Sequence, residues 1–405
     1  FKALENQNKK MENLQALLVG ENVELMIAVP TLLSRAGFVV DVITNCYIFK
    51  KHPAIRNFVF VANYDDITRT ASEKNKKNYS LIVIGDDNTL SKILNSDLSD
   101  EEKLELLPIK TIKNLDHIYS KIGLSRVFQE FGINTPEFRI AKDKSELKKF
   151  VESLGYPVLV KIDSSGGGFG VSQCSSNGDV EVLLNKLQTY PVLLQKKIQG
   201  VELDLSGFYQ NSKLIHFSCS RIERVNGKFG ASALRTYVQI AHLKKEIFDE
   251  LDLLGKALGA NGFVNVACIQ SDHDQKRYYI EADMRPNAWV DFSKYFGDDP
   301  AVQINNFFST SNTLQHPYPI NLAYPDKILL PYFSRIKLWE LATNRYFVWK
   351  YTPNRDHLAI ILYLIIRKIK TSVIKVCKPL MPDKYWIKLK YVYQKSRNSI
   401  LTILV

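Results

Sequence analysis

The chain of 405 residues contains few cysteines, no long apolar run and no internal repeat. Its five cysteines are odd in number and scattered, without a C-x-x-C pair. This argues against a disulfide framework or a zinc site and favours a reducing compartment. The longest apolar run, 358–366, has nine residues, about half of the ~18 that span a bilayer. The first residues lack the pattern of a secretory signal peptide. We therefore expect a globular, cytoplasmic protein.

Charge is distributed unevenly along the chain. The formal net charge is +12, and residues 331–405 account for all of it, with fifteen Lys or Arg and three Asp or Glu. Trp339, Trp349 and Trp386 lie in the same segment. Basic residues interleaved with aromatic ones suit an anionic membrane surface, and nucleic acid is a second alternative without a reader motif to support it. A helical cap with a solvated basic face is the third alternative.

Short apolar runs alternate with polar, helix-like segments in the first part of the chain. Strands are predicted over 14–20, 38–44, 57–62 and 79–85. Helices are predicted over 22–36 and 65–77. This alternation indicates a small open α/β domain. The loop after the first strand reads VGEN, so the G-x-G-x-x-G fingerprint of dinucleotide-binding proteins is absent.

The pattern changes to α+β from about residue 116. Helices are predicted over 116–131, 145–154 and 244–258, and strands over 138–140 and 158–162. Residues 196–290 otherwise resemble antiparallel strands. We expect four domains or subdomains. They are an α/β domain at 1–115, a subdomain with a glycine-rich loop at 116–195, a further α+β subdomain at 196–330, and a basic aromatic helical extension at 331–405.

Lys161 lies in the apolar strand VLVKI, five residues before a run of three glycines. A buried lysine is costly unless it meets an anion, although an edge-strand lysine can also extend to solvent. Backbone amides of Ser165, Gly166, Gly167, Gly168 and Gly170 can approach phosphate without side-chain clash. A flexible hairpin loop is the alternative for the glycines alone.

Glu281, Asp283 and Arg285 point to one face of a predicted strand because side chains alternate along a strand. Two carboxylates and an arginine on one face suit Mg²⁺ together with phosphate. Asn265, on a strand one hairpin upstream, would face these acids if the two strands pair. The alternative is a charged outer strand face with salt bridges.

A third set of residues lies in the stretch LLQKKIQGVE. Here a strand ending near Gln195 leads into a connector containing Ile198. The connector backbone could pair with an adenine edge, and Glu202 could accept hydrogen bonds from ribose hydroxyls. An ordinary strand end with a solvated glutamate explains the same residues.

In their order, these parts resemble the ATP-grasp superfamily over about residues 14–310. The resemblance is greatest to the branch containing the carbamoyl phosphate synthetase large subunit and biotin carboxylase. It implies an ATP-grasp fold with an N-terminal pre-ATP-grasp domain and two α+β subdomains around ATP. It assigns Lys121 and Lys161 to phosphate, the glycine loop to the phosphate lid, Gln195 and Ile198 to adenine, and Glu202 to ribose. Glu281, Asp283 and Asn265 correspond to the metal ligands for Mg²⁺ or Mn²⁺, and Arg285 and Lys161 to catalytic residues.

The chain departs from the family pattern at two metal positions. The family usually has an acid, sometimes Gln, where Asn265 stands, and Asn where Asp283 stands. The two changes together keep the charge of the set at −2, so we interpret them as a relocated carboxylate.

The resemblance implies activation of a carboxylate by the γ-phosphoryl of ATP and attack by an amine or a similar nucleophile. We therefore expect an ADP-forming carboxylate–amine ligase with small-molecule substrates. The alternatives are a phosphotransferase of the same fold, or a degenerate nucleotide-binding or scaffold protein with a tail that binds membranes or polyanions. Arg221, Arg224 and Arg235 are candidates for the acid substrate, or ordinary surface arginines.

Overall fold

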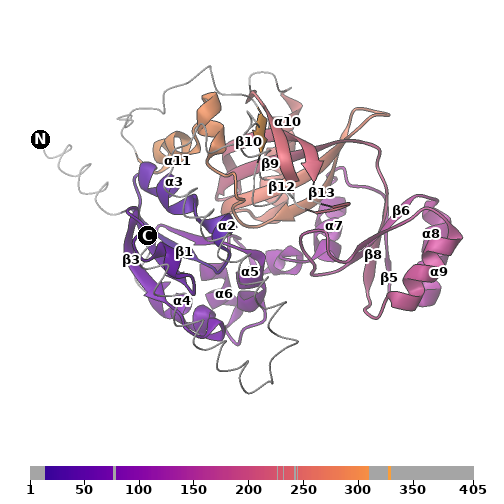
Figure 1. The fold of residues 1–405 in the computed structure, drawn as a ribbon, viewed down its shortest axis with the longest axis horizontal. Helices are drawn as coiled ribbons and strands as arrows, with labels where there is room; N and C mark the ends of the chain where they lie inside the picture. Colours follow the sequence, from indigo (N-terminus) through magenta and orange to yellow (C-terminus); the bar gives the residue numbers. More distant parts are fainter. Residues whose placement is uncertain are drawn as a thin grey trace, which may run out of the picture.

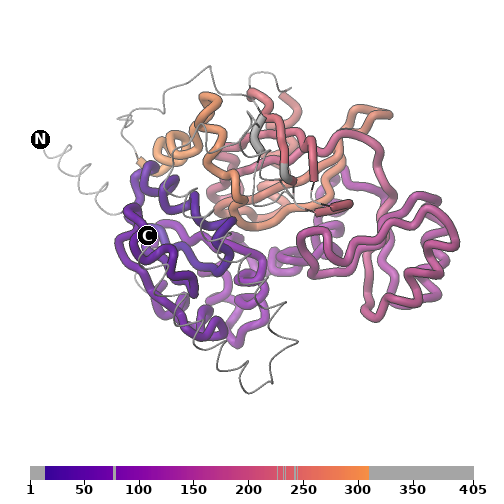
Figure 2. The backbone as a smooth tube through the Cα atoms, in the orientation of Figure 1, coloured from indigo at the N-terminus to yellow at the C-terminus, as the bar shows by residue number. Residues whose placement is uncertain are grey.

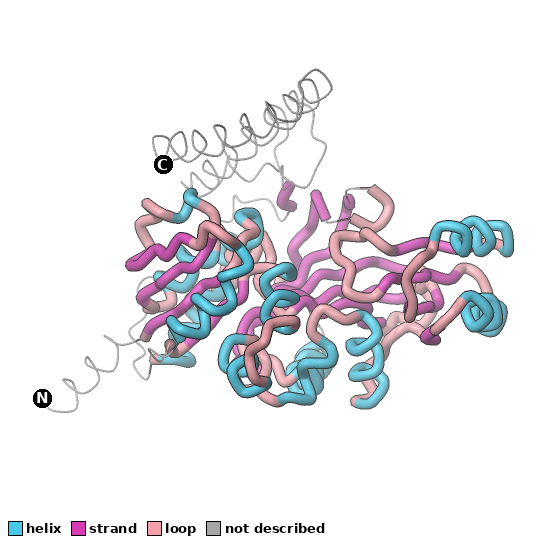
Figure 3. The backbone as a smooth tube through the Cα atoms, turned by 90° about the horizontal axis from the view of Figure 1, so that it is seen from below, coloured by secondary structure: helices cyan, strands magenta, loops and turns pink. Residues whose placement is uncertain are grey.

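The structure is a computed structural model that describes residues 14–75, 79–225, 227–230, 232–240, 243, 245–309 and 327–329. Three sheets follow one another across the molecule (Figure 1). The N-terminal sheet and the lid sheet lie at opposite ends, with the largest sheet between them (Figure 3). The basic aromatic extension predicted at 331–405 lies outside the described residues.

The N-terminal sheet is parallel and has the order β3-β2-β1-β4. Its strands are β1 Gln15–Val19, β2 Val39–Thr44, β3 Ile55–Phe60 and β4 Leu81–Ile84. The helical elements around it are α2 Val23–Met26, α3 Val29–Arg35, η1 Tyr47–Phe49, η2 Tyr64–Asp66, α4 Ile67–Asn75, α5 Asp87–Leu94 and α6 Asp100–Leu106. The four predicted strands are confirmed. The residues of β1, β2 and β4 are mostly buried, whereas β3 at the edge of the sheet is only partly buried.

The single helix predicted over 22–36 is wrong, since the structure has two helices there. Pro30 lies in the first turn of α3. Proline has no backbone N–H and clashes with the turn before it, so it suits the start of a helix and not its interior. The chain therefore ends α2 at Met26 and begins a new helix at Val29.

Helix α7, Lys121–Glu130, begins five residues later than predicted. The hydroxyl of Ser120 accepts a hydrogen bond from the amide of Gly123 at 2.9 Å and caps the helix there. The preceding residues form a 3₁₀ helix, η3 Ile112–His117. Phe128 of α7 packs edge-on against Tyr279, with ring centroids 6.3 Å apart, so α7 belongs to the core of the large sheet.

The lid sheet is antiparallel, in the order β5-β8-β6-β7. It projects from the rest of the molecule and carries two helices (Figure 1). Its apolar core uses residues between Ala141 and Leu194 only. Its elements are β5 Phe138–Ala141, α8 Lys144–Leu154, β6 Val158–Ile162, β7 Val171–Cys174, α9 Asn177–Lys186 and β8 Val192–Lys196.

The largest sheet has the order β13-β12-β9-β10-β11-β14 and is antiparallel. Its elements are β9 Gly200–Gln210, β10 Lys213–Val225, β11 Ser232–Val238, α10 Glu246–Leu258, β12 Gly262–Ser271, β13 Arg277–Asp283, η5 Phe292–Phe296, α11 Pro300–Phe308 and β14 Lys327–Leu329. Residues 273–276 lie in the turn that joins β12 to β13, which form the hairpin that the sequence predicts.

Helix α11 returns the chain to the N-terminal domain and lies beside α3 (Figure 2). Arg35 at the end of α3 forms ion pairs with Asp291, at 2.8 Å, and with Asp299. This contact holds the N-terminal sheet against the largest sheet. Within the described parts of the chain, no helix is long and apolar enough to cross a membrane.

Candidate functional site

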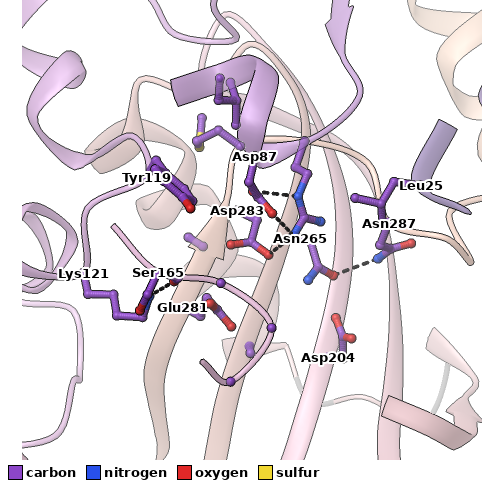
Figure 4. A pocket seen from close by; sticks show the side chains of 18 of the residues that line it. Leu25, Asp87, Tyr119, Lys121, Ser165, Asp204, Asn265, Glu281, Asp283 and Asn287 are labelled. Carbon is purple, nitrogen blue, oxygen red and sulfur yellow. Dashed lines mark hydrogen bonds and ion pairs between the residues drawn. The ribbon is translucent and has the colours of Figure 1, made fainter. Parts of the chain in front are cut away.

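Strands β12 and β13 bring the predicted metal residues together. Asn265 pairs directly with Asp283, and Ala267 pairs directly with Glu281. Asn265, Glu281 and Asp283 line one pocket of about 600 Å³, and Figure 4 shows all three there. Two carboxylates and an amide oxygen are hard donors of the type that Mg²⁺ prefers. The residue opposite Glu281 is an alanine, so β12 offers no ligand at that point.

Asp283 is the most strongly perturbed acid of the pocket. Burial raises the pKa of its carboxyl group well above the usual range, and the positive charge of Arg285 works in the opposite direction. Arg285 donates from Nη2 to Asp283 Oδ2 at 2.7 Å. A carboxylate in this position is stabilised by a nearby cation, which fits a divalent metal ion.

The glycine loop between β6 and β7 closes over the pocket from the lid sheet. Lys121 Nζ donates to the backbone oxygen of Ser165, and lies 3.2 Å from its hydroxyl. Gly168 has φ +78°, and a Cβ added there would meet the backbone oxygen of Phe229 at 2.0 Å. Only glycine therefore allows this close approach between the loop and the segment joining β10 to β11.

Asp163 fixes the base of the glycine loop. Its carboxylate accepts hydrogen bonds from the hydroxyl of Ser120, at 3.0 Å, and from the amide of Ile122, at 3.1 Å. Both donors lie at the start of α7. The first turn of α7, which carries Lys121, is thus tied directly to the loop that holds Ser165.

Lys161 is buried on β6, with 7% of its surface exposed. Burial lowers the pKa of its ammonium group to about 8, while the charge of Glu281 partly opposes the shift. No shift to this extent is expected of a lysine that extends to solvent. The lysine is therefore enclosed near the acids, as an anion-binding role requires.

The predicted adenine end contains an unpaired acceptor. Gln195 is 2% exposed, and its Nε2 donates to Ser125 Oγ at 3.4 Å. Its Oε1 is buried and has no hydrogen-bond partner among the described residues. A buried acceptor without a partner is costly, and an amino group of a bound base would satisfy it.

The pocket brings together most, but not all, of the predicted residues. Those that line it are Lys121, Ser165, Gly166, Gly167, Gly168, Glu202, Asn265, Glu281, Asp283 and Arg285. Those that do not line it are Lys161, Gly170, Gln195 and Ile198. Burial raises the pKa of Glu202, and the nearby charges of Asp204 and Glu281 add to the effect.

Sequence reasoning missed several residues of the pocket. Asp87 and Asn287 line it, as does Asp204, which follows Glu202 by two residues and so shares its face of β9. The alternation along β9 could have indicated Asp204. Nothing local in the sequence could have indicated Asp87, because it comes from the N-terminal domain.

The three arginines predicted as candidates for binding the acid substrate differ in their exposure to solvent. Arg221 and Arg224 are exposed on β10. Arg235 is 1% exposed, pairs with Asp204 at 3.0 Å, and places its guanidinium 3.3 Å from the centre of the Trp289 ring. It is a buried partner of a pocket acid and not a surface arginine.

Comparison with known proteins identifies related sequences. Residues 126–206 match the ATP-grasp domain model. The multifunctional protein URA2 of Saccharomyces cerevisiae is 27% identical over 194 residues, which is 45% of this chain and 9% of that protein. The carbamoyl phosphate synthase large chain of Pyrococcus furiosus is 24% identical over 202 residues, covering 47% of this chain and 19% of the relative. The matched segment thus spans a small part of these relatives.

Solved structures share the fold over a larger part of the chain. An L-amino acid ligase from Bacillus licheniformis superposes with a TM-score of 0.54 at 17% identity, covering 76% of this chain and 77% of that one. The N5-carboxyaminoimidazole synthetase of Staphylococcus aureus, complexed with ADP, gives 0.55 at 16% identity, covering 69% and 73%. The protein carries an ATP-grasp domain and has the ATP-grasp fold, so the resemblance predicted from the sequence is confirmed. Within that fold, its sequence is similar to carbamoyl phosphate synthase large chains.

Proposed function

We propose that the protein is an ATP-dependent ligase that activates a carboxylate as an acyl phosphate, releases ADP, and joins the acyl group to an amine or similar nucleophile. One observation carries the proposal. One pocket of about 600 Å³ is lined both by the glycine loop with Lys121 and by Glu281, Asp283 and Arg285. This combination supports a site in which the first group binds the ATP phosphates and the second group holds a metal ion.

The relatives support the same reaction class. Their names describe carbamoyl phosphate synthesis, ligation of amino acids and carboxyaminoimidazole synthesis. A biotin carboxylase domain with the same fold, at a TM-score of 0.54 and 16% identity, holds MgADP and bicarbonate. The substrates of this chain are small molecules of the carboxylate and amine classes under the proposal.

The residues of the pocket divide the work between them. Lys121 and Lys161 offset the charge of the ATP phosphates, and Arg285 stabilises the transferred phosphoryl group. Glu281, Asp283 and Asn265 hold Mg²⁺, which when bound neutralises phosphate charge and orients the phosphates. No three His, Cys, Asp or Glu side chains form a ready metal cluster within the described residues. The phosphates and water would therefore complete the coordination of the ion.

The glycine loop excludes water while the acyl phosphate exists. A carboxylate oxygen of the substrate attacks the γ-phosphorus, and ADP leaves. The nucleophile then attacks the acyl carbon, and inorganic phosphate leaves. Closure of the loop against Phe229 protects the mixed anhydride from hydrolysis between these steps.

Calorimetric titration with a non-hydrolysable Mg·ATP analogue tests the nucleotide site. We expect the wild type to bind and Lys161→Ala to weaken binding at least tenfold, about 1.4 kcal/mol. Lys148→Ala is the matched control, because Lys148 lies on the same lid but is paired with Glu181 at its surface. Failure of the wild type to bind would contradict the proposal.

A screen for ADP release then tests the reaction. A ligase releases ADP at its full rate only when a carboxylate and a nucleophile are both present at saturating concentrations. A phosphotransferase would need only one acceptor, and a scaffold protein would release none. Release that is independent of any amine or similar nucleophile would contradict ligation while leaving the nucleotide site intact.

A further inference from the structure

Two carboxylates from distant parts of the chain share the guanidinium of Arg285. Arg285 Nε donates to Asp87 Oδ1 at 2.7 Å, and Nη2 donates to Asp87 Oδ2 at 2.8 Å. Nη2 also donates to Asp283 at 2.7 Å. Asp87 is 198 residues away in sequence and belongs to the N-terminal domain. Figure 4 shows Asp87 and Asp283 close to one another in the pocket.

The N-terminal domain places Asp87 through its neighbour Asp86. One oxygen of Asp86 caps α5 by accepting from the amide of Thr89 at 2.9 Å. The other accepts from the amides of Glu21, at 2.7 Å, and Asn22, at 3.1 Å. The loops after β1 and β4 are thereby locked together. Asp87 is the first residue of α5 and is free of the capping role, so its carboxylate is available to Arg285.

The pair is largely enclosed, and its geometry is specific. The side chains of Arg285 and Asp87 are 12% and 25% exposed. Two parallel N–H···O bonds between a guanidinium and a carboxylate fix the plane of the arginine as well as its position.

Asp87 also determines which N–H groups of the Arg285 guanidinium remain available to another acceptor. Its carboxylate occupies the Nε and Nη2 edge, and among the described residues Nη1 has only a long bond of 3.3 Å to the backbone oxygen of Pro286. Without Asp87, the guanidinium would have Asp283 as its one acidic hydrogen-bond partner among the described residues. It could then collapse onto that acid, which is a proposed metal ligand.

We propose that Asp87 is a positioning residue for phosphoryl transfer, which holds Arg285 in the orientation that acts on the γ-phosphate. The N-terminal α/β domain then contributes a residue to the ATP-grasp site. This inference rests on the proposed function, since it assumes that the pocket binds Mg·ATP. It goes beyond that function by adding a residue from another domain to the reaction.

The affinity ratio between Mg·AMPPNP and Mg·ADP isolates the contribution of the γ-phosphate. Calorimetry would give this ratio for the wild type, Asp87→Asn and Arg285→Gln. We expect the wild type to prefer Mg·AMPPNP, and Asp87→Asn to lower the ratio at least threefold while the Kd for Mg·ADP changes less than twofold. A residue with only a structural role would alter both affinities together.

Two further variants make the test specific. Asp100→Asn removes an acid from the same position of the next helix, because Asp100 is the exposed first residue of α6. The ratio should stay at the wild-type value there. In the Arg285→Gln background, Asp87→Asn should have no further effect, because it acts through Arg285. Asp87→Ser replaces Asp87→Asn if the latter does not fold, with the same expected fall.

Each outcome decides between the alternatives. An unchanged ratio in Asp87→Asn, a wild-type ratio of 1, or a further fall in the Arg285→Gln background overturns the role of Asp87 while leaving the nucleotide site standing. Failure of the wild type to bind either nucleotide overturns the proposed function and the inference with it.

Discussion

Arg235 and Asp204 form an ion pair that is almost closed to solvent. Nη2 lies 3.0 Å from Oδ2, and the two side chains are 1% and 10% exposed. Arg235 also donates to Ser220 at 3.0 Å and stacks on Trp289. The other oxygen of Asp204 has no partner within the described residues. The pair therefore holds a pocket acid in place beneath the proposed site.

Removal of this arginine should destabilise the protein strongly. Arg235→Met leaves Asp204 as a buried charge without a counter-ion, and we expect a loss of about 3–5 kcal/mol in the free energy of unfolding. Denaturant unfolding measures the loss. The double variant Arg235→Met with Asp204→Leu should recover a large part of it. Arg221→Met, which breaks an exposed pair with Glu223, should change stability by less than about 0.5 kcal/mol.

Nucleotide affinity should fall as the pH rises above the pKa of Lys161. Burial holds that pKa at about 8, so the ligand-free lysine loses its charge above this pH. We expect the Kd for Mg·ADP to rise with pH above about 8, up to tenfold per unit. Lys161→Arg keeps its charge and should show a flat profile. The same slope in both proteins would exclude Lys161 as the titrating group.

The same lysine should also affect stability in a defined pH range. Its pKa is about 8 in the folded protein, against 10.5 for an ordinary lysine. The unfolded chain therefore binds more protons between these values, so the contribution of Lys161 to stability rises with pH over this window. Relative to Lys161→Met, the free energy of unfolding of the wild type should increase between pH 8 and 10.5. A constant difference would contradict the lowered pKa.

Substitution of one lid glycine should impair closure. Gly168→Ala forces a side chain into the backbone of Phe229 and into a positive φ, whereas an added Cβ at Gly166 has nothing within 4 Å. We expect Gly168→Ala to raise the Kd for Mg·ADP about tenfold, while Gly166→Ala changes it less than twofold. Equal affinities in the two variants would show that contact with Phe229 is not needed.

The hypothesis of a relocated carboxylate can be tested at the proposed metal ligands. If Asp283 carries the charge that Asn265 lacks, Asp283→Asn should reduce Mg·ATP turnover about as much as Glu281→Gln. Asn265→Asp combined with Asp283→Asn keeps the net charge of the set and should restore part of the activity. Full turnover in Asp283→Asn, together with none in Glu281→Gln, would rule out the relocation.

Local pattern was sufficient for much of the fold. Strands such as 14–20 and 158–162 were predictable because a short apolar run in an α/β or α+β context has few alternatives to burial in a sheet. Errors occurred where one residue changed the local backbone. Pro30 divided a predicted helix, and the hydroxyl of Ser120 set the start of α7.

The sequence by itself determined the order of the candidate site motifs, because each motif depends on spacing within one or two elements. These motifs are a strand lysine, a glycine loop and an E-x-D-x-R strand preceded by Asn265. Only the tertiary structure decided how Asp87 meets Arg285, how Arg235 becomes buried against Asp204, and that Ala267 faces Glu281. These contacts join segments that are far apart in the chain or depend on strand register. A local pattern shows neither which distant segments meet nor the register in which two strands pair.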